Sequence, residues 1–394
     1  MPLGEAGVYV HIPFCALKCA YCDFASFCGL EPHFDRYVDG VCAQARAEAP
    51  AWQSLRFGSL FIGGGTPTLL SPAALGRVIS TLHNLLPWQQ APEISIEANP
   101  GTVTAADLQA LRRLGVNRLS LGVQSMQAHE LAMLGRIHTV ADVVHAVTAA
   151  RQAGLTNINL DLIYGLPGQS LADWQASLEQ ALALGPEHLS LYGLSLEEGT
   201  PLAASVADGL LPEPDDELAA DMYTWAAERL QVAGYAQYEL SNWARRSPGD
   251  AQRVYPQLAC HHNLLYWHNE RYLGLGAAAA SFDGERRTVA LEHPLRYLDA
   301  LAAGEGVIAS EETLNPAERL DETVVLGLRL VRGVSWAWLT ARFGVDARQV
   351  YADVIAAQQA QGLLLADAQG MRLTPRGRLL GNRVFAAFLR DEVR

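Results

Sequence analysis

The sequence predicts an α/β protein whose larger part is a partial (β/α)6 barrel, open on one side. Three observations lead to this prediction. Short apolar runs alternate with helical stretches, the alternation occurs six times, and polar residues recur where the apolar runs end. Strands that alternate with helices form parallel sheets. Six repeats, where a complete barrel of this kind has about eight, leave the barrel incomplete.

The predicted strands are short apolar runs, leucine-rich or β-branched, that are too short to be helices. Glycine, proline or polar residues bound each run, as is usual at strand ends. The six runs are 8–12, 59–62, 93–97, 118–122, 157–162 and 188–194.

Helical segments lie between these runs, and several begin with a residue that caps helices. Ser71 stands directly before Pro72, and Thr104 stands three residues before Asp107. Side-chain oxygens at such positions accept hydrogen bonds from the free amides of the first turn. The predicted helices are 34–49, 72–86, 104–114, 140–153, 171–184 and 215–233.

The remainder of the chain is expected to form an extension of the barrel and a small C-terminal domain. The extension is expected to supply strands and loops that close the open side. Asn315 and Glu318 form a capping-box pattern, and the runs 363–365 and 371–373 indicate a hairpin, so the last part is expected to be helical and winged-helix-like. The predicted division is 1–235, 236–304 and 305–394.

Composition excludes several classes of protein. The net charge is −13 and no basic run is present, which argues against nucleic acid as a partner. No apolar stretch approaches the roughly 18 residues of a membrane helix, and no signal peptide opens the chain. Cys28, Cys42 and Cys260 are scattered and form no disulfide framework. A cytoplasmic protein is expected, and the roles of these three cysteines stay open.

Three further cysteines are clustered. Cys15, Cys19 and Cys22 have the spacing CxxxCxxC. Four-iron clusters are commonly held by four thiolates, so three thiolates leave one iron for a ligand that is not protein. A zinc site is the alternative, but zinc sites usually combine two CxxC pairs and no second pair exists here. The candidates for a fourth zinc ligand are His11, Asp23 and His33.

Polar or glycine residues follow the predicted strands at their carboxyl ends, which form the catalytic face of α/β barrels. Glycines at 63–65 let a backbone approach a ligand closely, and their spacing is not that of a dinucleotide-binding loop. Any one of these residues alone is explained as a surface or capping residue, but their repeated position favours a shared site. The set comprises Gly63, Gly64, Gly65, Thr66, Glu97, Asn99, Gln124, Ser125, Asp161, Tyr164 and Ser195.

The segment His262-Asn-Leu-Leu-Tyr-Trp267 is a second informative cluster. A histidine can be an axial ligand of haem iron, and aromatic side chains suit a flat macrocycle. The alternative is a structural histidine packed among aromatic rings. His261 and Cys260 adjoin the segment and are also potential ligands.

The cysteine spacing resembles the signature of the radical S-adenosylmethionine (SAM) superfamily. The whole set of motifs resembles the oxygen-independent coproporphyrinogen III oxidase family, and most closely its HemW branch of haem chaperones. The resemblance covers most of residues 8–280. Its motifs are the segments 9–13, 63–67, 97–100, 122–125, 134–138, 159–167 and 262–267.

This resemblance implies a [4Fe-4S] cluster on Cys15, Cys19 and Cys22, with SAM on the fourth iron. The glycine run resembles the segment that meets the amino group of SAM in this superfamily. A carboxylate suits the ribose hydroxyls, and Arg136 suits the methionine carboxylate. The implied SAM contacts are Tyr9, Gly64, Gly65, Thr66, Glu97, Gln124, Arg136 and Asp161.

One departure from the family pattern bears on function. The oxidases have a fourth cysteine two residues after the third, whereas this chain has Phe24 there, and their N-terminal extension is not expected here. The resemblance therefore implies a haem chaperone, with His262 as its haem-binding residue. Haem and an unidentified haem acceptor, such as a respiratory haem protein, are the implied partners. A radical SAM enzyme acting on a porphyrinogen is the alternative. SAM cleavage, the mode of haem attachment and a homodimer are left open.

Overall fold

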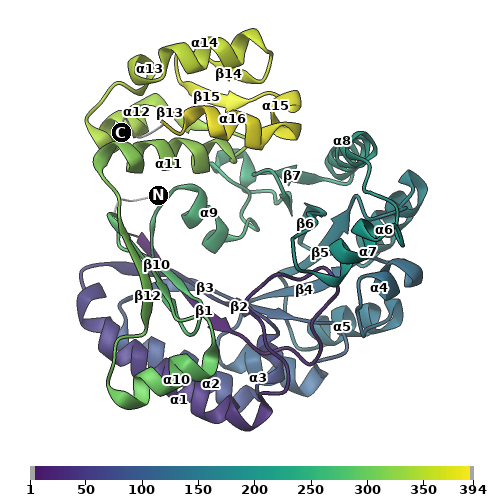
Figure 1. The fold of residues 1–394 in the computed structure, drawn as a ribbon, viewed down its shortest axis with the longest axis vertical. Helices are drawn as coiled ribbons and strands as arrows, with labels where there is room; N and C mark the ends of the chain where they lie inside the picture. Colours follow the sequence, from purple (N-terminus) through teal and green to yellow (C-terminus); the bar gives the residue numbers. More distant parts are fainter. Residues whose placement is uncertain (1–4, 391–394) are drawn as a thin grey trace.

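One sheet of twelve strands organises most of the chain in the computed structural model, which describes residues 5–390 (Figure 1). The strand order is β12-β11-β10-β9-β1-β2-β3-β4-β5-β6-β8-β7. A separate sheet of three strands belongs to the C-terminal part.

The six predicted strands are all present and lie side by side in chain order. Each pairs with the next in parallel, from β1 to β6. This order confirms the predicted parallel partial barrel. The strands are β1 (Glu5–Ile12), β2 (Arg56–Gly64), β3 (Trp88–Ala98), β4 (Arg118–Gln124), β5 (Ile158–Tyr164) and β6 (His188–Gly193).

Helices connect these strands and cover the outer face of the curved sheet (Figure 1). Thr104, Thr139 and Ser170 each begin a helix with a complete capping box, which satisfies amides that the first turn leaves free. The helices are α1 (Phe34–Glu48), α2 (Pro72–Leu85), α3 (Ala105–Arg113), α4 (Ala128–Met133), α5 (Val140–Gln152), α6 (Leu171–Ala183), α7 (Pro201–Ala207) and α8 (Asp216–Val232).

Strand β4 illustrates how the sheet separates core from site. Leu119, Leu121 and Val123 are fully buried in the main hydrophobic core. Successive side chains point to opposite faces of a strand, so Gly122 and Gln124 face the other way, where they line a cavity. The apolar run thus supports the helices, and the alternate positions build the inner surface of the barrel.

The segment after α8 lengthens the sheet at both edges instead of joining them. β9 pairs in parallel with β1, and β8 pairs antiparallel with β6. The sheet order therefore ends at β12 on one side and β7 on the other. The added elements are β7 (Tyr235–Gln237), β8 (Asn242–Arg245), α9 (His261–Trp267), β9 (Arg271–Leu275), β10 (Ala280–Phe282), β11 (Arg286–Ala290), α10 (Pro294–Ala303) and β12 (Ile308–Thr313).

Helix α9 lies in the hollow of the curved sheet (Figure 1). Its residue His262 contacts Ser59 of β2, and a Cβ on Gly7 of β1 would meet the side chain of Leu265 at 2.8 Å. The helix therefore packs against the inner side of β1 and β2. It occupies part of the space that further β–α repeats would fill in a complete barrel.

The C-terminal part has a hydrophobic core of its own, which extends from Leu320 to Phe388. Strands β14 and β15 form the predicted hairpin, and β13 pairs with the other side of β15. The elements are α11 (Pro316–Leu328), β13 (Val334–Ser335), α12 (Trp336–Phe343), α13 (Ala347–Val350), α14 (Ala352–Ala360), β14 (Leu364–Ala366), β15 (Gly370–Leu373), α15 (Pro375–Leu379) and α16 (Gly381–Phe388).

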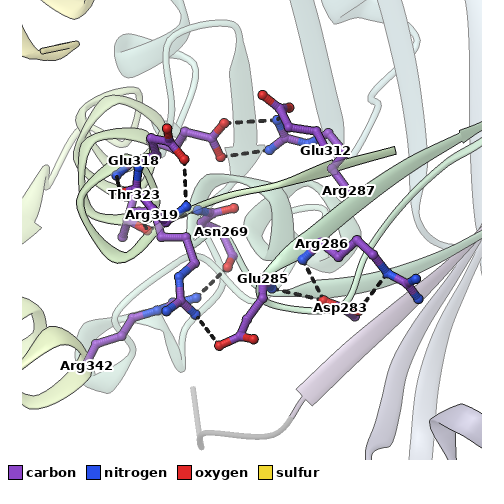
Figure 2. Close-up of polar contacts among 12 residues, drawn as sticks. Asn269, Asp283, Glu285, Arg286, Arg287, Glu312, Glu318, Arg319, Thr323 and Arg342 are labelled. Atoms are coloured by element: carbon purple, nitrogen blue, oxygen red, sulfur yellow. Dashed lines mark hydrogen bonds and ion pairs between the residues drawn. The ribbon is translucent and has the colours of Figure 1, made fainter. Parts of the chain in front are cut away.

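Arginines join this C-terminal part to the end of α9 and to the β10–β11 turn (Figure 2). Arg342 of α12 donates to the carbonyl oxygens of His268 at 2.8 Å and Asn269 at 2.5 Å. Arg319 of α11 donates to Glu285 at 3.0 Å. The residues that follow α9 are therefore fixed from the C-terminal side. Among residues 5–390, no helix combines the length and apolar character that crossing a membrane requires.

Candidate functional site

A cavity of about 390 Å³ opens at the carboxyl ends of the barrel strands. It brings together residues that are up to about 180 positions apart in the sequence, from Cys15 to Glu197, as strand ends of a barrel are expected to do. Nine of the twelve predicted site residues line it: Cys15, Cys19, Cys22, Gly64, Gly65, Glu97, Gln124, Arg136 and Asp161.

Thr66 and Tyr9 lie next to the cavity without lining it. The Thr66 hydroxyl is buried, 3.8 Å from Sγ of Cys15, and accepts a hydrogen bond from Asn99 at 2.8 Å. The Tyr9 hydroxyl is 3.0 Å from Nδ1 of His11, and the Tyr9 ring stacks on Phe61. Thr66 therefore contacts two residues of the cavity, Cys15 and Asn99, whereas the Tyr9 side chain packs against His11 and Phe61.

The cysteine loop follows β1 and is held at its base by backbone hydrogen bonds. The amide of Cys15 donates to the carbonyl of Phe27 at 3.0 Å, and the amide of Phe27 donates to Pro13 at 2.7 Å. The amide of Ala20 donates to Leu134 at 3.0 Å, which ties the middle of the loop to the segment after β4. Burial raises the pKa of the Cys15 and Cys22 thiols.

The spacing of the three sulfurs bears on the metal that they suit. Within residues 5–390, the group of potential ligands whose atoms all lie within 4.8 Å of one another is His129, Glu130 and Asp173. The three cysteine sulfurs do not form such a group, so at least one pair of them is more than 4.8 Å apart. Thiolates on a common loop that do not converge fit a multi-iron cluster better than a single zinc ion.

Glycines let β2 end directly against the cysteine loop. A Cβ on Gly65 would lie 2.5 Å from the carbonyl oxygen of Phe14 and 3.0 Å from Sγ of Cys15. Gly64 has φ +114°, a conformation that other residues rarely adopt. The amide of Gly64 donates to Glu97 at 3.1 Å. The glycine run therefore forms one wall of the cysteine site and orients the Glu97 carboxyl group.

Two partly buried carboxyl groups, those of Glu97 and Asp161, line the cavity. Burial, reinforced by the neighbouring Asp161, raises the pKa of Glu97 to about 8. Asp161 accepts hydrogen bonds from Ser120 at 2.9 Å and Asn159 at 2.8 Å, and burial raises its pKa as well. Such groups supply hydrogen bonds to hydroxyl-bearing ligands in a site shielded from water.

Arg136 contributes the cation of the site. Its Nη1 donates to Sγ of Cys19 at 3.3 Å, and its Nη2 donates to Asn99 at 2.6 Å and to the Gly122 carbonyl at 2.6 Å. Its Nε is buried and has no hydrogen-bond partner among the described residues. A buried donor without a partner is costly, so a ligand carboxylate would find one available here.

Gln124 adopts φ +66°, which is uncommon for a residue other than glycine. It stands at a bulge in the pairing of β4 with β5. Non-glycine residues in such conformations concentrate at ligand sites. The strain at the end of β4 therefore agrees with a position in the site.

The chemistry of the cavity fits a cluster with SAM as its added ligand. It offers three thiols, a guanidinium group with one free buried donor, two partly buried carboxyl groups and a wall of glycines. The thiols suit iron, and the guanidinium group suits the methionine carboxylate. The carboxyl groups suit the ribose hydroxyls, and the glycines let the backbone approach the ligand closely.

His262 does not lie in this cavity, and the structure does not present its ring to a ligand. The residue is 1% exposed. Its Nδ1 is 2.8 Å from the Ser59 hydroxyl and its Nε2 is 3.0 Å from the Tyr266 hydroxyl. Burial lowers the pKa of His262 to about 3. An iron ligand at Nε2 would have to displace the Tyr266 hydroxyl.

Asn99 and Tyr21 also line the cavity. Asn99 belongs to the set of strand-end polar residues that the sequence predicts, although it is not among the implied SAM contacts. It connects Thr66 to Arg136 through its amide group. Tyr21 was not predicted; it lies between Cys19 and Cys22, where only the structure shows that its side chain faces the cavity.

Phe24 occupies the position of the oxidases' fourth cysteine. It lines the cavity and is 64% exposed. Cys28 is exposed, whereas Cys42 and Cys260 are buried. Phe24 therefore places an apolar ring at the mouth of the cavity.

Comparisons with known proteins agree with this geometry. The sequence model of the radical SAM superfamily matches residues 9–181, and that of the HemN C-terminal domain matches residues 314–380. The solved structure of the radical SAM enzyme coproporphyrinogen III oxidase (HemN) from Escherichia coli covers 98% of this chain and 91% of its own. The TM-score is 0.83 at 24% identity, so this likeness concerns the fold.

Curated relatives match over nearly the whole chain. The heme chaperone HemW of Bacillus subtilis is 35% identical over 382 residues, which cover 97% of this chain and 98% of the relative. The heme chaperone HemW of Escherichia coli is 35% identical over 99% of both chains. The mitochondrial radical S-adenosyl methionine domain-containing protein 1 of Danio rerio is 32% identical over 98% of this chain and 87% of its own. The chain therefore belongs to the HemW family of the radical SAM superfamily.

Proposed function

We propose that this protein is a cytoplasmic haem chaperone that binds haem and transfers it to an acceptor protein, and that it holds a [4Fe-4S] cluster and SAM in its barrel. The chaperone role is supported by the relatives of Bacillus subtilis and Escherichia coli, which are heme chaperones. The observation that favours chaperone over oxidase is Phe24, which stands where the oxidases have a fourth cysteine. The acceptor is proposed to be another haem protein, such as a respiratory one.

Cys15, Cys19 and Cys22 would hold the cluster. A cluster of this kind, once reduced, supplies one electron for cleavage of a C–S bond of SAM. The protein's own residues position and shield the cofactors. Arg136 orients the methionine carboxylate by donating a hydrogen bond from Nε. Glu97 and Asp161 accept hydrogen bonds from the ribose hydroxyls.

The second candidate is a radical SAM enzyme that acts on a porphyrinogen. The groups in the cavity that suit SAM favour it, because binding and transfer of haem do not by themselves require SAM. An additional cysteine at position 24 would bring the loop to the oxidase pattern. The two candidates therefore differ in the chemistry of the cavity and in whether haem is retained.

The test begins with anaerobic reconstitution of the cluster in the full chain, followed by titration with haem. We expect a cluster of four irons and a stoichiometric haem complex. The same preparation, given SAM, a reductant and coproporphyrinogen, should form no decarboxylated product at a catalytic rate. Such a product would overturn the chaperone proposal, as would the absence of any saturable haem binding.

Transfer is tested separately. Haem-loaded protein is mixed with an apo-cytochrome and the two are separated by chromatography. We expect haem to pass to the acceptor faster than it does from serum albumin at the same haem concentration. A His262→Ala variant tests the sequence-based assignment, because an unchanged affinity and spectrum would remove His262 from haem binding.

A further inference from the structure

A second cavity, of about 540 Å³, lies where the end of α9 meets the C-terminal part. Its size is within the roughly 300–1,000 Å³ of sites for drug-sized ligands and cofactors. The segment before α9 contributes Tyr255 and the residue after α9 contributes His268. The C-terminal part contributes Trp338 and two arginines, Arg332 and Arg372.

His268 lies between two aromatic rings of this cavity. The centroid of its ring is 5.6 Å from that of Tyr255 and 5.7 Å from that of Trp338, both in edge-to-face arrangements. Its Nε2 forms a hydrogen bond of 3.0 Å with the Tyr255 hydroxyl. Burial lowers the pKa of His268 to about 4, so its imidazole is neutral at neutral pH, the form that ligates metals.

Two arginines and one carboxylate, that of Asp367, line the cavity, so the formal charge of its lining is positive. Arg332 donates to the carbonyl of Val254 at 3.2 Å and has no carboxylate within ion-pair distance among residues 5–390. Arg372 pairs with Asp367 at 2.8 Å, and both side chains are 42% exposed, so water screens this pair. Guanidinium groups bind carboxylates through paired hydrogen bonds.

We propose that this cavity receives the haem, with His268 as the ligand of its iron, the aromatic rings against the macrocycle, and Arg332 and Arg372 on the two propionates. This inference rests on the proposed function. When the iron binds Nε2, the Tyr255 hydroxyl gives up its hydrogen bond to that nitrogen. No covalent bond of the porphyrin is made or broken.

The arrangement gives His262 a different part to play. Ser59 and Tyr266 hold its ring, and the Glu93 carboxylate accepts from the amides of His261 and His262 at 3.0 and 3.2 Å. The start of α9 is thus anchored on the barrel. The helix ends at Trp267, directly before His268, and Arg342 donates a hydrogen bond to the His268 carbonyl. His262 is therefore a positioning residue that places His268 at the cavity.

The experiment compares haem binding by the full-length parent with His268→Ala, His262→Ala and a control. His145→Ala is the control, because His145 is an exposed histidine on α5. We expect His268→Ala to lower haem affinity at least tenfold and to remove the absorption and electron paramagnetic resonance signature of axial imidazole. Added imidazole should restore that signature in His268→Ala. His262→Ala should weaken binding but keep the imidazole signature, and His145→Ala should match the parent.

The arginines provide a second, independent readout that does not depend on the histidine variant folding. Arg332→Gln and Arg372→Gln should each weaken binding of haem several-fold and leave binding of haem dimethyl ester unchanged, because the ester lacks the propionate charges. Parent-like affinity and spectrum in His268→Ala would overturn the assignment while leaving the proposed function intact. A parent that binds no haem would overturn both.

Discussion

The guanidinium group of Arg136 donates one hydrogen bond to Sγ of Cys19, at 3.3 Å. The same group contacts Asn99 at the end of β3 and the Gly122 carbonyl on β4. One side chain therefore connects the cysteine loop to two strand ends. The proposed cluster and the proposed SAM site consequently share a residue.

Arg136→Ala should reduce SAM affinity by about ten- to a hundredfold in the reconstituted protein. The reason is that a hydrogen bond to a charged group contributes about 1.5–3 kcal/mol. Arg136→Lys keeps the charge but loses the planar donor pair, so its SAM affinity should lie between those of the parent and Arg136→Ala. Equilibrium dialysis against labelled SAM measures the effect, with the exposed Arg113→Ala as the matched control. Parent-like affinity in Arg136→Ala would remove this residue from the SAM site.

Gly65→Ala should impair retention of the cluster. The added Cβ would meet the Phe14 carbonyl oxygen at 2.5 Å, a backbone atom that cannot move aside on its own, and would press on Sγ of Cys15 at 3.0 Å. Gly249→Ala is the control, because a Cβ there meets nothing within 4 Å. Iron and sulfide content after anaerobic desalting is the measurement. A Gly65→Ala protein with the full iron content would contradict the close contact.

The strands and helices of the barrel could be predicted because each follows from local pattern. The apolar run at 118–122, for example, is confirmed as β4 (Arg118–Gln124). The site residues could be predicted as a group because parallel strands end at one face of a barrel. Tyr21 was not predicted, because nothing in the sequence around Cys19 and Cys22 shows which side chains of the loop face the cavity.

Helix α9 shows why the remainder could not be predicted. It has seven residues, and no side chain at its own N-terminus caps it. The carboxylate of Glu93, about 170 positions earlier in the sequence, accepts from its first amides instead. Short helices depend on tertiary contacts, so no nearby residue signals this one. The burial of His262 follows from the same distant contacts.

Substitution of any one of Cys15, Cys19 and Cys22 by serine should abolish the cluster. The three thiols line one cavity, and each substitution removes one of the three thiolates that the cluster needs from the protein. Visible absorbance and iron content after reconstitution measure the loss. Cys28→Ser is the matched control, because Cys28 is an exposed cysteine of the same loop. Full cluster absorbance in a Cys19→Ser protein would refute the ligand set.

Glu97→Gln should make the stability of the cofactor-free protein less dependent on pH. Burial raises the pKa of Glu97 from 4.5 to about 8, so between these values the folded chain holds a proton that the unfolded chain has released. Stability therefore falls as pH rises through this window, by up to about 5 kcal/mol for this group alone. Glutamine can still accept from the Gly64 amide and never ionises.

The measurement is the free energy of unfolding in urea at several pH values from 5 to 9, for the parent, Glu97→Gln and the exposed Glu213→Gln as control. The free energy of unfolding of Glu97→Gln, relative to that of the parent, should increase as pH rises towards 8. The reason is that only the parent must then keep a buried charge or take up a proton. Glu213→Gln should follow the parent throughout. A difference that stays constant over this range would show that Glu97 is ionised in the folded protein at pH 5 already.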